Sequence, residues 1–226
     1  MKFTYFGHSC FLVEIDGCRV LFDPFISPNP LAADIDVDSI EADYVLITHG
    51  HEDHVADAEA ILKRTGAKLI ANFEIVTWYG AKGIENAQPL NHGGSCTTEF
   101  GKVKFVNAIH SSVLPDGTYG GNPGGFVIET NDGNFYVSGD TALTLDMKLI
   151  AESTKLTWAA LCIGDTFTMG VGDAVRAASM VGVDYVIGTH YDTFPPIMLD
   201  HENAVGMFHN AGIRLRLPSI GETIEL

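Results

Sequence analysis

Short, mostly apolar stretches that are typical of β-strands open the chain. These stretches cover residues 3–6, 11–15 and 18–22. Asp16-Gly17 separates the last two and is typical of a two-residue hairpin turn. A continuous apolar run at residues 44–47 predicts a strand that is buried on both faces. The first part of the chain is therefore expected to be rich in β-structure.

Strand-like and helix-like segments follow one another after residue 57. Asp57 can cap a helix over residues 58–65, and Gly66 can close it. Further helices are expected at 73–79, 145–152, 173–181 and 200–210. Further strands are expected at 68–71, 95–100, 103–109, 126–130, 135–138, 159–163 and 185–188, with a closing strand pair at 214–217 and 223–226. No linker interrupts this order, so the pattern predicts a single α/β (α+β) domain over residues 1–226, in which two mixed sheets pack face to face with helices outside.

The composition is that of a globular protein, because 46% of the 226 residues are apolar and 19% are charged. The net charge of −16 repels phosphate backbones, so we expect no nucleic-acid partner. The four cysteines form no Cys-x-x-Cys pair and adjoin no histidine, which favours free thiols in a reducing compartment. No signal-peptide pattern and no apolar run long enough to span a bilayer is visible. We therefore expect a cytoplasmic protein without a membrane partner.

The segment Thr48-His49-Gly50-His51-Glu52-Asp53-His54 follows an apolar strand directly and holds the most informative chemistry of the chain. Imidazole and carboxylate are the ligands that suit zinc and the neighbouring first-row divalent metals. His49 and His51, separated by one residue, can converge on one ion, and Asp53 with His54 can hold a second. The alternative is a polar loop that happens to be rich in histidine. So dense a cluster favours the metal site.

Three residues elsewhere in the chain occupy the same kind of position as that segment, because each lies where an apolar strand ends and a loop begins. They are His110, Asp140 and His190. A single histidine after a strand is more often a surface or hydrogen-bonded residue, so each is weak evidence alone. Their common position makes them a ligand set together with the first segment, since a two-ion site needs more ligands than one loop supplies.

Other residues near these positions are candidates for supporting roles. His8 follows Gly7 at the end of the first strand and could donate a proton to a leaving group or bind a substrate oxygen. The alternative for His8 is a turn histidine bonded to the backbone. Asp165 also ends an apolar strand and could orient a metal-bound histidine from behind or cap a turn. Thr189 directly precedes His190 and is expected in the pocket or behind the ligands, whereas His92 is expected to be structural or at a pocket rim.

These motifs resemble those of the metallo-β-lactamase superfamily. The run His49-x-His51-x-Asp53-His54 is followed in order by His110, Asp140 and His190, and the similarity covers most of the chain. The resemblance is closer to the ascorbate-6-phosphate-lactonase-like branch and, within that branch, to a group of metal-dependent hydrolases. This closer similarity lies in residues 7–11, 91–95, 138–141, 164–170 and 189–195.

The resemblance implies a four-layer αββα sandwich, the metallo-β-lactamase fold, with the site at one edge of the sheets. It implies that one ion is held by His49, His51 and His110, that another is held by Asp53, His54 and His190, and that Asp140 bridges the two. Flavodiiron oxidoreductases of the same superfamily carry glutamate at the position of His51 and have a flavodoxin domain, which this chain lacks. We therefore expect two divalent ions per chain, zinc first with manganese, nickel or iron as alternatives, and hydrolysis rather than oxygen chemistry.

A hydroxide held between two divalent ions is nucleophilic at neutral pH, because the pKa of bound water falls from about 15.7 to about 7. We expect it to attack a carbonyl or phosphoryl centre, with Asp53 accepting a hydrogen bond from its proton. The two ions outweigh the negative charges of Asp53, Asp140 and the hydroxide, so the expected substrate is a small anionic lactone, ester or phosphodiester. Two alternatives stay open, a nuclease or RNA-processing hydrolase on the same fold and a metal-binding protein without catalysis. The chain could also assemble into a homo-oligomer, as related folds often do.

Overall fold

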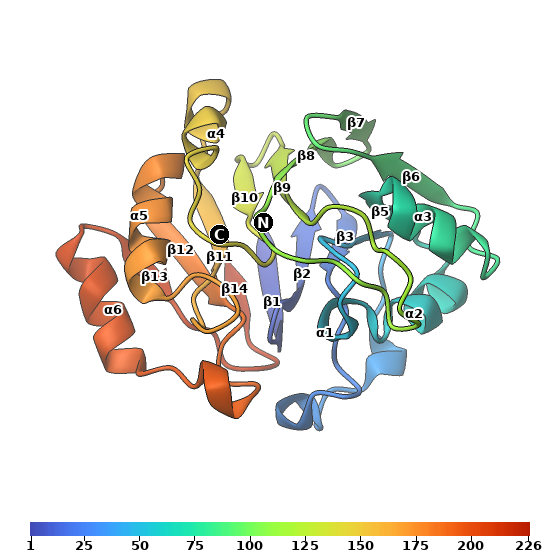
Figure 1. Cartoon of the computed structure of the whole chain (residues 1–226), viewed down its shortest axis with the longest axis horizontal. Helices are drawn as coiled ribbons and strands as arrows, with labels where there is room; N and C mark the ends of the chain where they lie inside the picture. Colours follow the sequence, from blue (N-terminus) through green and yellow to red (C-terminus); the bar gives the residue numbers. More distant parts are fainter.

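Two seven-stranded β-sheets lie face to face at the centre of the protein, and helices cover both outer faces (Figure 1). This computed structural model describes residues 1–226. The strands of the first sheet, in the order in which they pair, are β14 (Thr223–Glu225), β1 (Lys2–Gly7), β2 (Cys10–Ile15), β3 (Cys18–Phe22), β4 (Tyr44–Leu46), β5 (Lys68–Asn72) and β6 (Ala87–Leu90). Those of the second are β13 (Arg214–Arg216), β12 (Tyr185–Thr189), β11 (Trp158–Cys162), β10 (Phe135–Val137), β9 (Gly124–Glu129), β8 (Gly101–Asn107) and β7 (Ser95–Thr98).

The helices divide between the two outer faces. α2 (Ala58–Thr65) and α3 (Phe73–Gly80) cover the first sheet, whereas α4 (Met147–Ser153), α5 (Val171–Val181) and α6 (His201–Asn210) lie on the side of the second (Figure 1). α1 (Glu52–Val55) is a single turn after β4. Short 3₁₀ turns occupy Pro30–Ala32, Val37–Ser39 and Pro195–Ile197. No helix has the length and apolar character that a bilayer crossing requires.

The period-two alternation of the strands decides which side chains meet between the sheets. In β2, Phe11, Val13 and Ile15 belong to the larger hydrophobic cluster, which both sheets share. In β4, Leu46 belongs to that cluster, whereas Val45 points the other way into a second cluster that includes residues of α2 and α3. All three residues of β4 are buried, as predicted from the continuous apolar run.

Strand direction explains why residues distant in the sequence meet at one edge. β1 and β3 are both antiparallel to β2, and β3, β4 and β5 are parallel, so β1, β3 and β4 run the same way. β8 and β10 are both antiparallel to β9, and β10, β11 and β12 are parallel. Strands that run the same way end at the same edge of their sheet. The candidate site is built by the loops that follow β1, β3, β4, β8, β10 and β12.

The αββα sandwich is confirmed, and the predicted hairpin at Asp16-Gly17 is present. The predicted closing strand pair is wrong, because β13 pairs with β12 in the second sheet and β14 pairs with β1 in the first. The sequence does not predict β6, whose Gln88 and Pro89 interrupt the apolar pattern. Proline is tolerated there because β6 is an edge strand.

Asp57 precedes α2 but makes no cap bond with it. Its carboxylate instead accepts hydrogen bonds from the backbone N–H groups of Ile26 (2.6 Å) and Ser27 (2.9 Å), which ties the loop after β3 to the start of the helix. Gly66 ends the helix in the left-handed conformation, with φ of 71°, as predicted.

Candidate metal centre

The seven predicted metal ligands lie together at the shared edge of the two sheets. Their ligand atoms form three overlapping groups, and within each group all atoms lie within 4.8 Å of one another. The groups are His49, His51 and His110; His49, His54 and Asp140; and His8, Asp53, His54 and His190. The first and third groups correspond to the two ligand sets that the family resemblance implies, and the third group gains His8.

The first set is drawn from two loops. Nε2 of His49 lies 2.9 Å from Nδ1 of His51 across Gly50. The ring of His110, from the loop after β8, has its centroid 5.1 Å from that of His49 and 5.0 Å from that of His51. Two unprotonated ring nitrogens repel each other at such a distance, so the pair needs either a proton or a cation between its nitrogens.

Asp140 stands between the two sets. Its Oδ2 lies 2.9 Å from Nε2 of His190, 3.4 Å from Nε2 of His54 and 3.6 Å from Nε2 of His110. The Asp140 side chain is only 2% exposed. A buried carboxylate that contacts histidines from both sets has the position that a bridging ligand requires.

The donor atoms fit a pair of divalent cations. Nε2 of His54 and Oδ1 of Asp140 are buried and have no hydrogen-bond partner. Leaving buried polar atoms unpaired costs about 1–3 kcal/mol each. A cation would satisfy both atoms, and imidazole nitrogens with carboxylate oxygens are the ligands preferred by zinc, manganese and iron.

Burial keeps the first set in its metal-binding form. It lowers the pKa of His49 well below the usual value, with a further contribution from His54, and it also lowers the pKa values of His51 and His110. These three imidazoles are therefore neutral near pH 7, and a neutral imidazole has a lone pair for a metal ion.

The centre of the site favours positive charge. Burial acts to lower the pKa of His54, but the carboxylates of Asp140 and Asp23 outweigh it and raise that pKa. Burial acts to raise the pKa of Asp140, but His190 and His54 outweigh it and lower that pKa. Cations placed beside Asp140 would take over the role that protons on these histidines otherwise have.

Asp23 is a site residue that the sequence analysis does not identify. It follows β3, and its Oδ2 lies 2.9 Å from Nδ1 of His54. The same carboxylate accepts hydrogen bonds from the backbone N–H (2.8 Å) and the hydroxyl (2.7 Å) of Thr48. Asp23 thus orients His54 from behind and anchors the start of the histidine segment. Its position at the end of a strand is the same signal that indicates His110, Asp140 and His190.

His8 lies in the second set rather than in a surface turn. Its Nε2 is 3.1 Å from Oδ2 of Asp53, and its ring centroid is 4.2 Å from that of His190. Burial lowers the pKa of His8 to about 4, so its imidazole is neutral near pH 7. The hydrogen bond from His8 lowers the pKa of Asp53 although burial acts to raise it.

Three non-glycine residues at the site have left-handed backbone conformations. The φ values are 55° for His8, 41° for Asp23 and 59° for His190. Such conformations cost about 1–3 kcal/mol each and persist where the surroundings fix them. Each of the three follows a strand end directly and turns its side chain into the site.

Asp165 does not lie behind a ligand. The residue is exposed, and its carboxylate accepts a hydrogen bond from the backbone N–H of Thr166 at 2.7 Å. Left-handed conformations at both residues turn that carboxylate back onto its own loop, which makes Asp165 a turn cap. Thr189 is buried at the end of β12, where it pairs with Cys162 and directly precedes His190.

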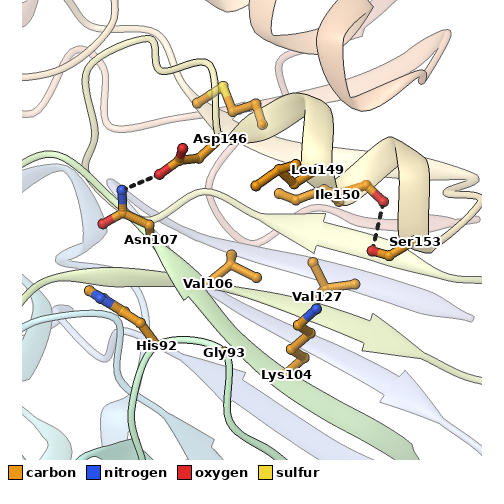
Figure 2. A pocket seen from close by; sticks show the side chains of 11 residues that line it. His92, Gly93, Lys104, Val106, Asn107, Val127, Asp146, Leu149, Ile150 and Ser153 are labelled. Carbon is orange, nitrogen blue, oxygen red and sulfur yellow. Dashed lines mark hydrogen bonds between the residues drawn. The ribbon is translucent and has the colours of Figure 1, made fainter.

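A separate cavity of about 310 Å³ lies between α4 and strands β8 and β9 (Figure 2). Val106, Val127 and Ile150 supply apolar walls, and Asn107 donates a hydrogen bond to Asp146 at 2.7 Å. His92 also lines this cavity, and its Nε2 donates to the carbonyl oxygen of Pro123 at 2.8 Å. None of the seven predicted ligands lines it.

The fold agrees with comparisons with known proteins. A family model described as the beta-lactamase superfamily domain matches residues 2–190. The chain therefore belongs to the metallo-β-lactamase superfamily.

Relatives that match along the whole chain carry the name of one group within that superfamily. A UPF0173 metal-dependent hydrolase of Christiangramia forsetii is 54% identical over 227 residues, covering 100% of both chains. One from Methylacidiphilum infernorum is 48% identical, again over 100% of both chains. The solved structure of Igni18, described as a novel metallo hydrolase from the hyperthermophilic archaeon Ignicoccus hospitalis, is 36% identical, with a TM-score of 0.89 over 99% of this chain and 97% of that one.

Proposed function

We propose that this protein is a metal-dependent hydrolase with two divalent ions per chain, and that it acts on small anionic molecules. The observation that carries the proposal is the position of Asp140, a buried carboxylate that contacts histidines from two separate ligand sets. The names of the full-length relatives support the same reaction class.

The ligands divide between the two ions as the family resemblance implies. His49, His51 and His110 would hold one ion, and Asp53, His54 and His190 would hold the other, with Asp140 shared between them. Ions bound in this way would lower the pKa of water to about 7 and so supply a hydroxide for attack on a carbonyl or phosphoryl centre.

Two side chains of the second set have further tasks in the proposed reaction. Asp53 presents Oδ2 to the site, where it can accept a hydrogen bond from the attacking nucleophile. His8 has its Nε2 3.1 Å from that oxygen. A neutral His8 with its hydrogen on Nε2 could share that hydrogen between Asp53 and a substrate oxygen that gains negative charge. Of the two roles expected for His8, binding a substrate oxygen therefore fits its environment better than full proton transfer.

The charge of the loaded site favours an anionic substrate. Two divalent ions would exceed the combined charge of Asp53, Asp140 and one hydroxide by one unit. The further carboxylate of Asp23 lies behind His54 and accepts hydrogen bonds from Thr48, so the ions would still present positive charge to the substrate in a protein of net charge −16. A small anion can enter this local field, whereas a long polyanion is repelled by the rest of the surface. Binding of a small molecule rather than a nucleic acid is therefore part of the proposal.

The test is a hydrolysis screen with protein loaded with zinc, manganese or nickel and assayed for metal content. The panel contains lactones, esters, phosphodiesters, nucleotides and a short RNA, with neutral and carboxylated or phosphorylated analogues of each small molecule. We expect turnover of a small anionic member and its loss in Asp140→Asn. Protein that binds no metal, or that hydrolyses neutral and anionic analogues equally well, would contradict the corresponding part of the proposal. Preference for RNA would make the protein a nuclease instead.

A further inference from the structure

Two lysines of β8 project from the same face of the second sheet but have different surroundings. Lys102 and Lys104 are two residues apart on the strand, which places both side chains on one face. Lys102 lies opposite Glu129 of β9 and forms an ion pair with it, with Nζ 3.3 Å from Oε1. Lys104 lies opposite Val127 instead and has no ion-pair partner. The ammonium group of Lys104 is therefore uncompensated in a protein of net charge −16.

Lys104 lines the cavity between α4 and strands β8 and β9 (Figure 2). The volume of about 310 Å³ lies within the range of small-molecule sites, which is about 300–1,000 Å³. Figure 2 shows Lys104 at one end of the cavity and Asn107 with Asp146 at the other. The walls between these ends are formed by apolar side chains of the sheet and of α4, namely Val106, Val127, Met147, Leu149 and Ile150.

The arrangement of charge in the cavity favours a ligand with one negative group. Asp146 is the only carboxylate among the lining residues, and it accepts the hydrogen bond from Asn107 at 2.7 Å rather than pairing with Lys104. An ionised ligand oxygen could accept a charge-assisted hydrogen bond from Lys104, and such bonds are stronger than those between neutral groups. The negative net charge of the protein opposes ligands that carry several negative charges.

The apolar walls favour hydrocarbon in the rest of the ligand, because burial of apolar surface is favourable in proportion to its area. Val127 is 2% exposed and closes the floor of the cavity, whereas Leu149 is 59% exposed. A hydrocarbon group in the cavity would cover part of Leu149. The observations thus combine one unpaired cation with an apolar surface that is open to solvent on the side of α4.

We propose that this cavity is a second binding site, which accepts a small amphipathic carboxylic acid with its carboxylate on Lys104 and its hydrocarbon group against α4. None of the seven predicted metal ligands lines the cavity, so the site is separate from the metal centre. The inference goes beyond the proposed function and does not depend on it.

The first measurement locates the site with 4-phenylbutyrate as the probe. Methyl-labelled protein is titrated and followed by NMR, both after metal removal and after loading with zinc. In metal-free protein we expect saturable shifts in the methyl signals of Val106, Val127 and Ile150, while those of Ile47 and Val55 beside the histidine segment stay unchanged. Zinc-loaded protein should give the same Kd for the three cavity residues. Shifts confined to Ile47 and Val55, or no saturable shift at all, would overturn the proposal.

The second measurement tests the role of the charge of Lys104. We expect Lys104→Met to weaken binding of 4-phenylbutyrate about tenfold or more, the effect of losing one hydrogen bond between charged groups. Lys102→Met is the matched control, since it removes the paired lysine from the same face of the same strand, and it should bind with native affinity. Native affinity in Lys104→Met would contradict the proposed contact.

A ligand series tests the same contact in the native protein. The neutral 4-phenylbutanamide and the cationic 4-phenylbutylamine have the same hydrocarbon group, and we expect both to bind more weakly than the acid. Equal binding of the amide would show that the cavity recognises only hydrocarbon. Stronger binding of the amine would show that Asp146 rather than Lys104 selects the ligand, and either result overturns the proposal. None of these measurements requires hydrolysis, so failure of this inference is distinguishable from failure of the proposed function.

Discussion

Nδ1 of His54 lies 2.9 Å from Oδ2 of Asp23, a residue that reaches the site from the end of β3. We expect Asp23→Asn to weaken metal binding about 10–100-fold, because groups that orient a metal-binding histidine have effects of this size. Competition with a chromogenic chelator measures the affinity. Asp57→Asn is the matched control, since Asp57 is also buried and bonded to backbone N–H groups but does not contact a candidate ligand. Equal affinities for Asp23→Asn and the native protein would contradict the supporting role of Asp23.

Asp140→Asn tests the bridging position. An amide has no negative charge to share between two cations, so we expect the protein to lose at least one ion and about 100-fold or more of its activity. Elemental analysis of purified protein gives the metal content per chain. Asp146→Asn, which changes an exposed carboxylate at the start of α4, should leave both quantities unchanged. Two ions retained in Asp140→Asn would show that this carboxylate does not bridge.

His8→Ala separates a catalytic role from a ligand role. Removal of one hydrogen bond to a developing negative charge typically lowers the rate about 100–1,000-fold, so we expect a loss in that range with the metal content unchanged. His92→Ala removes a histidine that lies in the other cavity and serves as the control (Figure 2). Loss of one ion from His8→Ala would make His8 a ligand, and native turnover with native metal content would remove it from the mechanism.

Metal removal should lower the melting temperature. Ligands bound only by the folded state stabilise it by about 4 kcal/mol at a thousand times the dissociation constant, which for a chain of this length raises Tm by roughly 10 °C. Thermal melts before and after dialysis against a chelator, followed by addition of zinc, measure the shift. A melting temperature that is the same with and without metal would show that the ions do not bind the native site with useful affinity.

The four cysteines should react at two distinct rates. Burial raises the pKa of all four thiols, but Cys10 and Cys162 are buried whereas Cys18 and Cys96 are only partly buried and can be reached from solvent. We expect a thiol-specific reagent to label Cys18 and Cys96 in the native protein and all four cysteines after unfolding, since a thiolate must form and be reached. Peptide mass analysis identifies the labelled positions. Rapid labelling of Cys162 in the native protein would contradict the packing of β11 against its neighbours.

The sequence predicts the sandwich and the ligand cluster because both depend on local patterns. Each proposed ligand outside the histidine segment comes within three residues of the end of an apolar run, and strands of the same direction must end at the same edge. Asp23 shows the limit of this reasoning, since nothing in the sequence distinguishes an aspartate that faces His54 from one that caps a turn, as Asp165 does. The sequence also does not predict that β13 and β14 lie in different sheets, because the strand with which each one pairs depends on which edge of each sheet is free.

The division of the ligands between the two sheets has a consequence for how the protein matures. The first sheet supplies His8 and the segment from His49 to His54, and the second supplies His110, Asp140 and His190. During synthesis, residue 190 emerges from the ribosome long after the histidine segment. In the proposed two-ion site, the second ion would therefore have no complete coordination sphere until the last fifth of the chain has been made and the two halves have come together. Ion capture would then be one of the last steps in the formation of the native protein.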